Sequence, residues 1–309
     1  MKKEVDSTNQ TSLEKQLARY LLSLREGEQI LNTRDLADQF DSSLGSISST
    51  INFLEESGAV KITRRGHLGS FLDQKSIGPL WNIIEEGPMV IATTLPSFPK
   101  CEGLATAIYT LLNDAGVETY LTFIRGSNNR IEALRDGRCH AIIMSELAAD
   151  ALCGKDEEVI LRLPPKTFVT DHRVFYRREK QDPSQQFRVG IDHESFDIKY
   201  LTELEFGESD VEFQKMPFLQ IDLYLGSSHV DAAISNLDHL ARLKSSSDLD
   251  SRPLSPKVQA LIGDRDTSAA LIARSYSASE KIVLQTVLDP EKVVKIQEDV
   301  ELLRIIPRY

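Results

Sequence analysis

The chain has 309 residues, of which 41% are hydrophobic and 27% are charged, a balance that excludes collagen-like, low-complexity or largely disordered proteins. Its length suits two or three domains. The formal charge of −11, from 36 basic and 47 acidic residues, excludes a protein that binds nucleic acid through overall positive charge, so any nucleic-acid site must be local.

The cellular compartment is indicated by the absence of membrane, secretion and metal-binding patterns in the sequence. No apolar run approaches the roughly 18 residues that a membrane helix needs. The first ten residues, MKKEVDSTNQ, contain no apolar stretch of the kind that a secretory signal requires. The three cysteines, Cys101, Cys139 and Cys153, are odd in number and show no metal-ligand spacing. We therefore expect a cytoplasmic protein with no membrane segment and no metal site.

Residues 1–74 are predicted to contain three helices. The first begins at Ser12 and places four leucines on one face, Leu13, Leu17, Leu21 and Leu24. Thr33 is a suitable N-cap for a short second helix that extends to Phe40. In the third helix, one face is formed by Ile47, Ile51 and Leu54. Gly58 follows the last turn of that helix, where glycine commonly ends a helix.

A two-stranded wing is predicted after the third helix. Short strands at Val60–Thr63 and Ser70–Leu72 flank a tip of sequence RRGHLG. The two arginines of the tip supply positive charge, and its glycines let the backbone approach a phosphate closely. Three helices followed by such a hairpin are typical of a winged helix–turn–helix DNA-binding domain. The alternative is a small helical domain that is used only for protein contacts.

The third helix lacks the residue types that usually read guanine. Its outward face would present small polar residues without Arg or Lys, namely Gly45, Ser46, Ser48, Ser49 and Asn52. Residues 1–74 carry nine basic and eleven acidic side chains, so we expect weak DNA affinity from one domain alone. A homodimer on a two-fold operator would remedy this, because two linked half-sites multiply their binding constants.

Residues 75–87 are expected to be a connector. The pair Gly78-Pro79 is predicted to break any helix. The apolar residues that follow it, Leu80, Trp81, Ile83 and Ile84, are too hydrophobic for a free linker. They are expected to pack on the next domain or on a second subunit.

From residue 88 to residue 309, predicted strands alternate with helices, as in an α/β layered domain. Glu132–Met144 and Asp222–Ile234 both run from a helix through glycine into an apolar strand. This repeat predicts a two-lobed sensor with a first lobe at about 88–175 plus 265–309 and a second lobe at about 176–264. The segment 245–256, rich in Ser, Asp and Pro, is expected to be an exposed loop where the chain returns to the first lobe.

In two-lobed α/β folds, ligands bind in the crevice outside the carboxyl ends of the strands. The polar residues that follow the predicted strands are Thr93, Thr94, Ser97, Ser127, Asn128, Asn129, Arg130, Ser145, Glu146, Asp192, Ser195, Ser235 and Asn236. Helices begin just beyond several of them, so free backbone N–H groups would favour an anion. We expect this set to bind a small polar or anionic molecule. For any single member, a helix cap is the alternative.

The sequence lacks the usual signatures of catalysis. It has no Gly-rich phosphate loop, dinucleotide fingerprint, G-x-S-x-G elbow or His-x-x-x-His pair. Asp171 and His172 are neighbours on a predicted strand and therefore point to opposite faces. A lowered pKa is conceivable for Cys101 near a helix start, but a structural thiol is the stronger interpretation. We predict a binding protein without catalytic residues or a cofactor. The alternative is an enzyme or solute-binding module with an accessory N-terminal domain.

Two segments resemble a known family. INFLEESGAVKITRRGHLGSFL, from Ile51 to Leu72, resembles the helix and wing of GntR-like repressors, above all the YhfZ-type subgroup with its R-G-H-L-G-x-F-L wing. LPSFPKCEGLATAI, from Leu95 to Ile108, resembles the start of the YhfZ-type sensor domain. The similarity extends over most of the chain. It implies a bacterial transcriptional regulator, dimeric, with a periplasmic-binding-protein-like effector domain.

The resemblance also implies roles for individual residues. Arg64, Arg65 and His67 would be wing contacts to DNA, and Arg34 would contact a phosphate at the start of the second helix. Ser43, Ser46 and Ser49 would be contacts of the reading helix. The chain departs from the broader GntR pattern at Leu44 and Ser48, where arginines are usual. That departure leaves the operator sequence and the strength of binding open, and the resemblance implies no particular effector.

Overall fold

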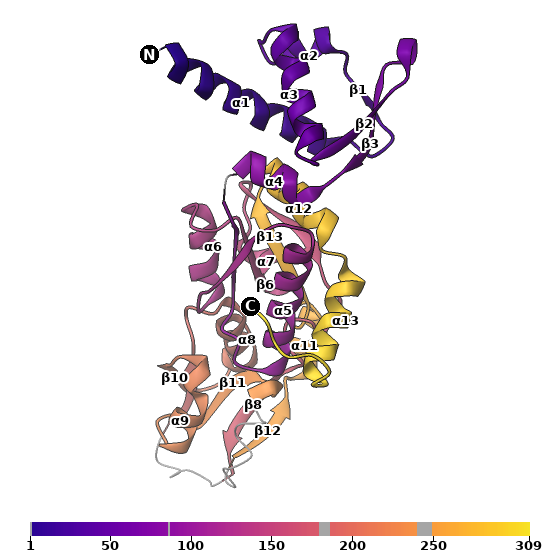
Figure 1. Cartoon of the computed structure of the whole chain (residues 1–309). Coiled ribbons are helices and arrows are strands. Elements are labelled where there is room, and N and C mark those ends of the chain that lie inside the picture. Colours follow the sequence, from indigo (N-terminus) through magenta and orange to yellow (C-terminus); the bar gives the residue numbers. More distant parts are fainter. Residues whose placement is uncertain (1, 86, 179–185, 240–248) are drawn as a thin grey trace. The chain divides into compact units, whose positions relative to one another are not determined.

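The computed structural model describes residues 2–85, 87–178, 186–239 and 249–309, with side chains from residue 11 onward. The chain divides into two compact units (Figure 1). One comprises Met1–Met89, Thr110–Tyr120 and Ser277–Leu288, and the other comprises Val90–Tyr109, Leu121–Tyr276 and Asp289–Tyr309. Among the described residues, no helix is both long and apolar enough to cross a lipid bilayer.

The N-terminal segment forms the predicted three helices and wing (Figure 1). Its elements are α1 (Lys2–Ser23), β1 (Gln29–Ile30), α2 (Thr33–Gln39), α3 (Leu44–Glu56), β2 (Val60–Arg64) and β3 (Ser70–Lys75). Leucines spaced along α1 and the inward residues of α2 and α3 are buried, among them Leu17, Leu36, Ile47 and Leu54. The two-residue strand β1 was not predicted, and it pairs antiparallel with β3 to give the sheet order β1-β3-β2.

Three details of these helices differ from the sequence prediction. Helix α1 begins well before Ser12. The N-cap of α2 is Asn32, whose Oδ1 accepts hydrogen bonds from the backbone N of Arg34 and Asp35 at 3.0 Å each. Thr50 is buried in α3, whereas Ile51 is partly exposed, because the inward face is rotated slightly from the predicted one.

The predicted connector is a helix, α4 (Ile77–Glu85), so the expected break at Gly78-Pro79 is wrong. Pro79 lies in the first turn, where the N–H that proline lacks would have no intrahelical partner. Gly78 lets the α4 backbone pack closely against the backbone of Gly116, because a Cβ at this position would lie 2.5 Å from the carbonyl oxygen of Gly116. The apolar side chains of α4 are buried against α1 and α12 (Ala278–Val287) of the same chain.

The first lobe is built on a five-stranded sheet of order β5-β4-β6-β13-β7. Its strands are β4 (Met89–Thr93), β5 (Thr119–Phe123), β6 (Ala141–Ser145), β7 (Glu157–Arg162) and β13 (Ala269–Arg274). β4 and β6 are parallel, whereas β13 runs antiparallel to both β6 and β7. The helices of this part are α5 (Pro99–Asp114), α6 (Ser127–Arg135), α7 (Glu146–Leu152) and α13 (Pro290–Glu301). Apolar strand residues such as Ile142 and Ile272 form its core.

The second lobe repeats this arrangement, with a sheet of order β10-β9-β11-β8-β12. Its strands are β8 (His172–Arg177), β9 (Phe187–Ile191), β10 (Val211–Lys215), β11 (Ala232–Asn236) and β12 (Leu249–Pro253), and its helices are α8 (Phe196–Phe206), α9 (Ile221–Gly226) and α11 (Pro256–Ile262). β6 and β11, which end the two repeated sequence segments, occupy the central place in their respective sheets. The predicted two-lobed α/β fold is therefore confirmed.

Two predicted boundaries of the second lobe are corrected. β8 pairs with β11 and β12, so the chain enters the second sheet before His172 and not near residue 175. The predicted loop 245–256 contains the strand β12 and the start of α11, while its residues 245–248 lie outside the described part of the chain. A run of half-buried and exposed residues that includes Asp, Ser and Pro explains why this edge strand was read as a loop.

Candidate functional site

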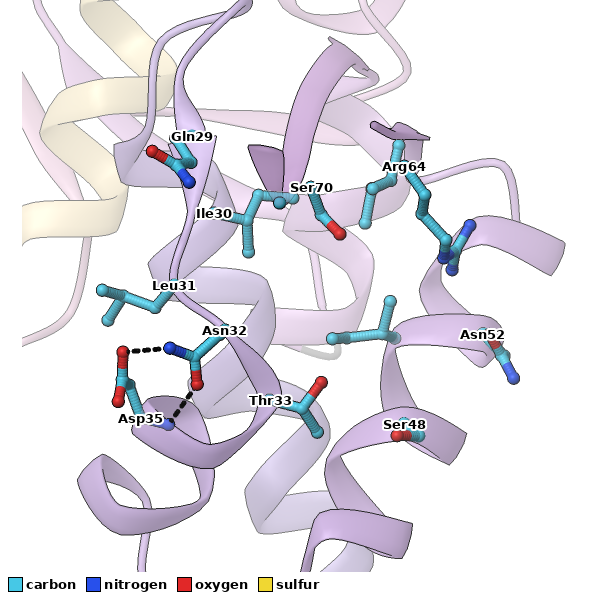
Figure 2. A pocket seen from close by; sticks show the side chains of 13 residues that line it. Gln29, Ile30, Leu31, Asn32, Thr33, Asp35, Ser48, Asn52, Arg64 and Ser70 are labelled. Carbon is cyan, nitrogen blue, oxygen red and sulfur yellow. Dashed lines mark hydrogen bonds between the residues drawn. The ribbon is translucent and has the colours of Figure 1, made fainter. Parts of the chain in front are cut away.

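A hollow of about 460 Å³ lies in the helix–turn–helix segment between the start of α2, the outer side of α3 and the wing (Figure 2). We call it the wing hollow. Asn32, Thr33 and Asp35 line it from the α2 side, Ser48 and Asn52 from α3, and Arg64, Gly69 and Ser70 from the wing. Polar side chains, together with the aliphatic side chains of Ile30, Leu31, Ile51 and Ile62, thus line a groove bounded by the predicted reading helix and the wing.

The wing places its three predicted DNA contacts differently. Arg64 is exposed but donates to the Glu55 carboxylate of α3, whose hydrogen bond raises the pKa of Arg64. Arg65 is exposed, with its guanidinium carbon 4.7 Å from the centre of the Phe71 ring. His67 is exposed on the short 3₁₀ turn Gly66–Leu68. Arg65 and His67 are therefore better placed to meet DNA than Arg64.

The wing tip is fixed by Gln29 of β1. Its Nε2 donates to the carbonyl of Leu68 at 3.0 Å. A Cβ on Gly69, which has a φ of 90°, would lie 2.7 Å from the same nitrogen. The positive φ therefore favours glycine at this turn, and a Cβ there would displace the flexible end of the Gln29 side chain.

The serines predicted to contact DNA from α3 are partly engaged within the helix. Ser43 is the N-cap, accepting from the backbone N of Ser46 at 3.0 Å, and the hydroxyls of Ser43 and Ser46 are 2.9 Å apart. Ser49 is exposed and makes no hydrogen bond to the described part of the chain through its hydroxyl. Arg34 is exposed in the first turn of α2, as a phosphate contact requires.

The second candidate site is the interlobe crevice, which encloses a cavity of about 30 Å³. Four predicted ligand residues line it, Thr94, Arg130, Ser195 and Asn236. The remaining lining residues are Phe98, Cys101, Gly126, Phe168, Val169, His172, Asp197, Ile198 and Phe218. A cavity of this volume has room for about one water molecule. The lobes are therefore closed on each other.

Arg130 is the most unusual group of the crevice. It is 3% exposed, its Nη1 donates to the carbonyl of Ile124 at 2.9 Å, and its Nε has no hydrogen-bond partner in the described chain. Burial lowers its pKa to about 10, although the charge of Asp197 acts in the opposite direction. A buried guanidinium with an unsatisfied N–H is costly, and an anion at this point would reduce the cost.

Acidic side chains and a histidine share the crevice with Arg130. Burial raises the pKa of Asp197, which accepts a hydrogen bond from the Ser145 hydroxyl at 2.6 Å. His172 Nδ1 lies 2.7 Å from Asp266 Oδ2, and both side chains are buried. Burial also raises the pKa of the Cys101 thiol to about 12, so it is a structural thiol and a lowered pKa is excluded.

Five of the predicted ligand residues make hydrogen bonds between the two lobes. Ser127 Oγ accepts from the Phe196 backbone N at 2.9 Å, Asn128 donates to the carbonyl of His193 at 3.1 Å, and Asn129 donates to the carboxylate of Glu194 at 3.2 Å. Ser145 bonds Asp197, and Asp192 binds Arg125 at 3.1 Å. These groups lie at the predicted edge of the sheets, but here they bind protein and hold the lobes together.

The remaining four predicted ligand residues also lie outside the cavity lining. Thr93 and Ser235 are buried at strand ends, and Ser97 lies in the loop before α5. Glu146 forms an ion pair with Arg162 inside the first lobe. The described residues contain no group of three or more His, Cys, Asp or Glu side chains arranged to hold a metal.

Sequence reasoning missed His172, Asp197 and Asp266. β8 and β13 are antiparallel to their neighbours, so the starts of these strands lie at the edge where the parallel strands end. The sequence pattern that indicates these residues is a polar residue just before, or at the start of, each antiparallel strand. This pattern adds to the polar residues that follow the parallel strands. Asp197 lies in the first turn of α8, two residues beyond the predicted Ser195.

Comparison with known proteins identifies the family. Residues 77–309 match the family model described as the YhfZ C-terminal domain, and residues 25–72 match a helix-turn-helix domain. YhfZ of Escherichia coli strain K12 is 31% identical over 288 residues, which covers 92% of each chain. The chain belongs to the YhfZ family.

Solved structures agree with this assignment. The crystal structure of YhfZ from Shigella flexneri is similar with a TM-score of 0.59 at 27% identity, covering 75% of this chain and 98% of that one. SsuA, the periplasmic aliphatic sulphonate binding protein of Escherichia coli, has a TM-score of 0.51 at 12% identity, covering 70% of this chain and 75% of that one. At that identity the likeness shows the fold alone. This YhfZ-family chain therefore combines a helix–turn–helix domain, which indicates DNA-binding regulation, with a periplasmic-binding-protein-like α/β fold.

Proposed function

We propose that this YhfZ-family chain is a ligand-responsive transcriptional regulator of the GntR-like winged-helix class. It acts in the cytoplasm as a homodimer, with two wings and two reading helices on a two-fold operator. A small polar or anionic metabolite binds in the interlobe crevice and is the effector. The joining of a helix–turn–helix domain to a two-lobed α/β domain in one chain supports this combination of roles.

The observation that carries the ligand half of the proposal is Arg130. Its guanidinium lines the crevice cavity, is 3% exposed and retains an N–H without a partner in the described chain. A buried cation in this state favours an anionic ligand group, because a charge-assisted hydrogen bond replaces an unsatisfied one. The small cavity means that a ligand of several heavy atoms must separate some of the contacts between the lobes.

Regulation follows if the ligand binds one lobe arrangement better than another. The ligand can shift the equilibrium only by its differential affinity for the two arrangements. The crevice is proposed to bind its ligand without converting it. The protonated Cys101 thiol supports this, because the thiolate is the nucleophilic form.

The ligand half is tested by thermal unfolding of the full chain with a panel of small carboxylates, phosphates and sulfonates. A ligand at about 100 times its Kd should stabilise the wild type by about 2.7 kcal/mol. Arg130→Met should abolish the shift and Arg130→Lys should weaken it. Arg138→Met, which removes an exposed arginine paired with Asp136, is the control and should keep the shift. A ligand that stabilises Arg130→Met as strongly as the wild type would contradict the assignment.

A further inference from the structure

The outward stripe of α3 combines one apolar and a few small polar residues. Leu44, Ser48 and Asn52 follow each other at intervals of four residues and so lie on one side of the helix. Gly45 and Ser49 lie next to them on the same side. All five are exposed, and the Leu44 side chain is 51% exposed at the first helical position. No Arg or Lys occurs between Leu44 and Glu56.

The hydrogen bonds within α3 decide which polar groups remain available. Ser48 Oγ donates to the carbonyl of Leu44 at 3.0 Å, while the hydroxyls of Ser43 and Ser46 bond each other. In the described part of the chain, the Asn52 amide has no hydrogen-bond partner, as is also true of the Ser49 hydroxyl. Figure 2 shows the Asn52 and Ser48 side chains on α3, one helical turn apart, where they line the wing hollow. Asn52 therefore supplies the available amide on this stripe, which can donate through its Nδ2 and accept through its Oδ1 at the same time.

The chemistry of the major groove matches these groups to one kind of base pair. An asparagine amide forms two hydrogen bonds with adenine, whose N7 accepts and whose N6 donates. Guanine offers two acceptors at the same edge, so the amide oxygen would face a second oxygen. An exposed leucine suits the 5-methyl group of thymine. Among the described residues, Arg64 is the one arginine that lines the wing hollow, and its guanidinium is already hydrogen-bonded to Glu55.

We propose that α3 reads A·T base pairs, with Leu44 against a thymine methyl group and Asn52 bonded to adenine. This inference rests on the proposed DNA-binding function and adds the composition of the operator half-site. The half-site is A·T at the positions that face α3. Ser49 contacts a base edge or phosphate beside them.

The experiment selects preferred sites from a random DNA duplex library with the full chain and then measures their affinities. The selected half-sites should contain A·T pairs in the part protected by α3. Replacing the critical thymine by deoxyuridine removes only the methyl group and should weaken wild-type binding about fourfold, the effect of losing one buried methyl contact. Leu44→Ala should bind both DNAs equally. Leu223→Ala, which trims another exposed leucine on α9, should behave like the wild type.

A second variant tests the adenine contact. Asn52→Ala should bind with similar affinity whether adenine or guanine occupies the assigned position, while the wild type should prefer adenine by about tenfold or more. Selected half-sites with G·C pairs facing α3, or equal deoxyuridine effects in the wild type and Leu44→Ala, would overturn this inference while leaving DNA-binding function intact. Wild-type protein that selects no sequence at all would contradict the proposed function itself.

Discussion

Arg64 of the wing and Glu55 of α3 are joined by two hydrogen bonds, from Nη1 to Oε1 at 3.3 Å and from Nη2 to Oε2 at 2.5 Å. The pair links the wing to the reading helix, and both side chains are accessible to solvent, at 55% and 24% exposure. A DNA phosphate that binds Arg64 must compete with the Glu55 carboxylate. The wing therefore offers DNA less available positive charge than its two arginines indicate.

The first prediction concerns this competition. Glu55→Gln should increase affinity for any DNA about three- to tenfold and steepen the salt dependence by about one unit, because Arg64 becomes available to a phosphate. Glu56→Gln makes the same charge change at the next residue, which is exposed and without an ion pair among the described residues. Fluorescence anisotropy on labelled DNA across a salt series measures both. Equal gains from the two variants, or weaker binding by Glu55→Gln, would show that Glu55 does not compete for Arg64.

The second prediction concerns the contact between the lobes. Gly126 has a φ of 80°, and a Cβ there would lie 2.4 Å from the carbonyl oxygen of Glu194 in the second lobe. Gly126→Ala should therefore lower the free energy of unfolding or, if the lobes separate instead, increase the radius of gyration in solution. Gly263→Ala is the control, since Gly263 has a φ of 60° but open space around its Cβ position.

Chemical denaturation measures the free energy of unfolding of the two variants, and small-angle X-ray scattering measures their radius of gyration. Gly263→Ala should cost only the backbone strain, about 1–2 kcal/mol. Gly126→Ala should cost more than this or should open the lobes. If the two variants have the same stability and the same radius as each other, the close approach of Gly126 to Glu194 is not present in solution.

Much of the fold was predictable because its signals are local. The four leucines predicted on one face of the first helix are buried, and the two predicted wing strands correspond to β2 and β3. The two-residue strand β1 was not predictable, since it exists only through its pairing with β3. Helix α4 was missed because Gly78-Pro79 is read as a break, and only the packing against Gly116 shows why a glycine lies there.

The crevice illustrates a different limit. Arg130 was predicted from its position just after a strand end, and it does line the cavity. Ser127 and Asn128 were predicted on the same grounds, but they bind the opposite lobe. Sequence indicates which groups reach the edge of a sheet, whereas the width of the crevice depends on how two separately folded lobes meet.

The third prediction is a pH dependence of stability. Burial opposes protonation of His172, but the hydrogen bond to Asp266 and the nearby charges of Asp266, Asp197 and Asp171 outweigh it and raise the pKa above the ordinary 6.5. Because the folded state then holds the proton more tightly, the pair stabilises the fold fully below about pH 6.5. That contribution is lost as the pH rises through the folded-state pKa.

Unfolding free energies measured from about pH 5.5 to pH 9 test whether the contribution of the His172–Asp266 pair to stability falls as the pH rises. The wild type should lose stability relative to His172→Gln as the pH rises across this range. His193→Gln changes an exposed loop histidine and should keep the wild-type profile. Parallel profiles for the wild type and His172→Gln would show that the pair does not contribute in this way.

The central claim is that one chain couples an interlobe ligand to DNA binding. Its most direct test is the anisotropy of labelled DNA selected by the full chain, titrated with protein across a salt series, with and without a ligand that stabilises the wild type but not Arg130→Met. We predict tight, sequence-selective and salt-dependent binding that Arg65→Ala weakens, whereas Lys292→Ala, which removes an exposed lysine of α13, leaves it unchanged. Adding the ligand should change the affinity, and Arg130→Met should abolish that change. Binding to the selected DNA that is no tighter than to random DNA, both with and without the ligand, would contradict the account.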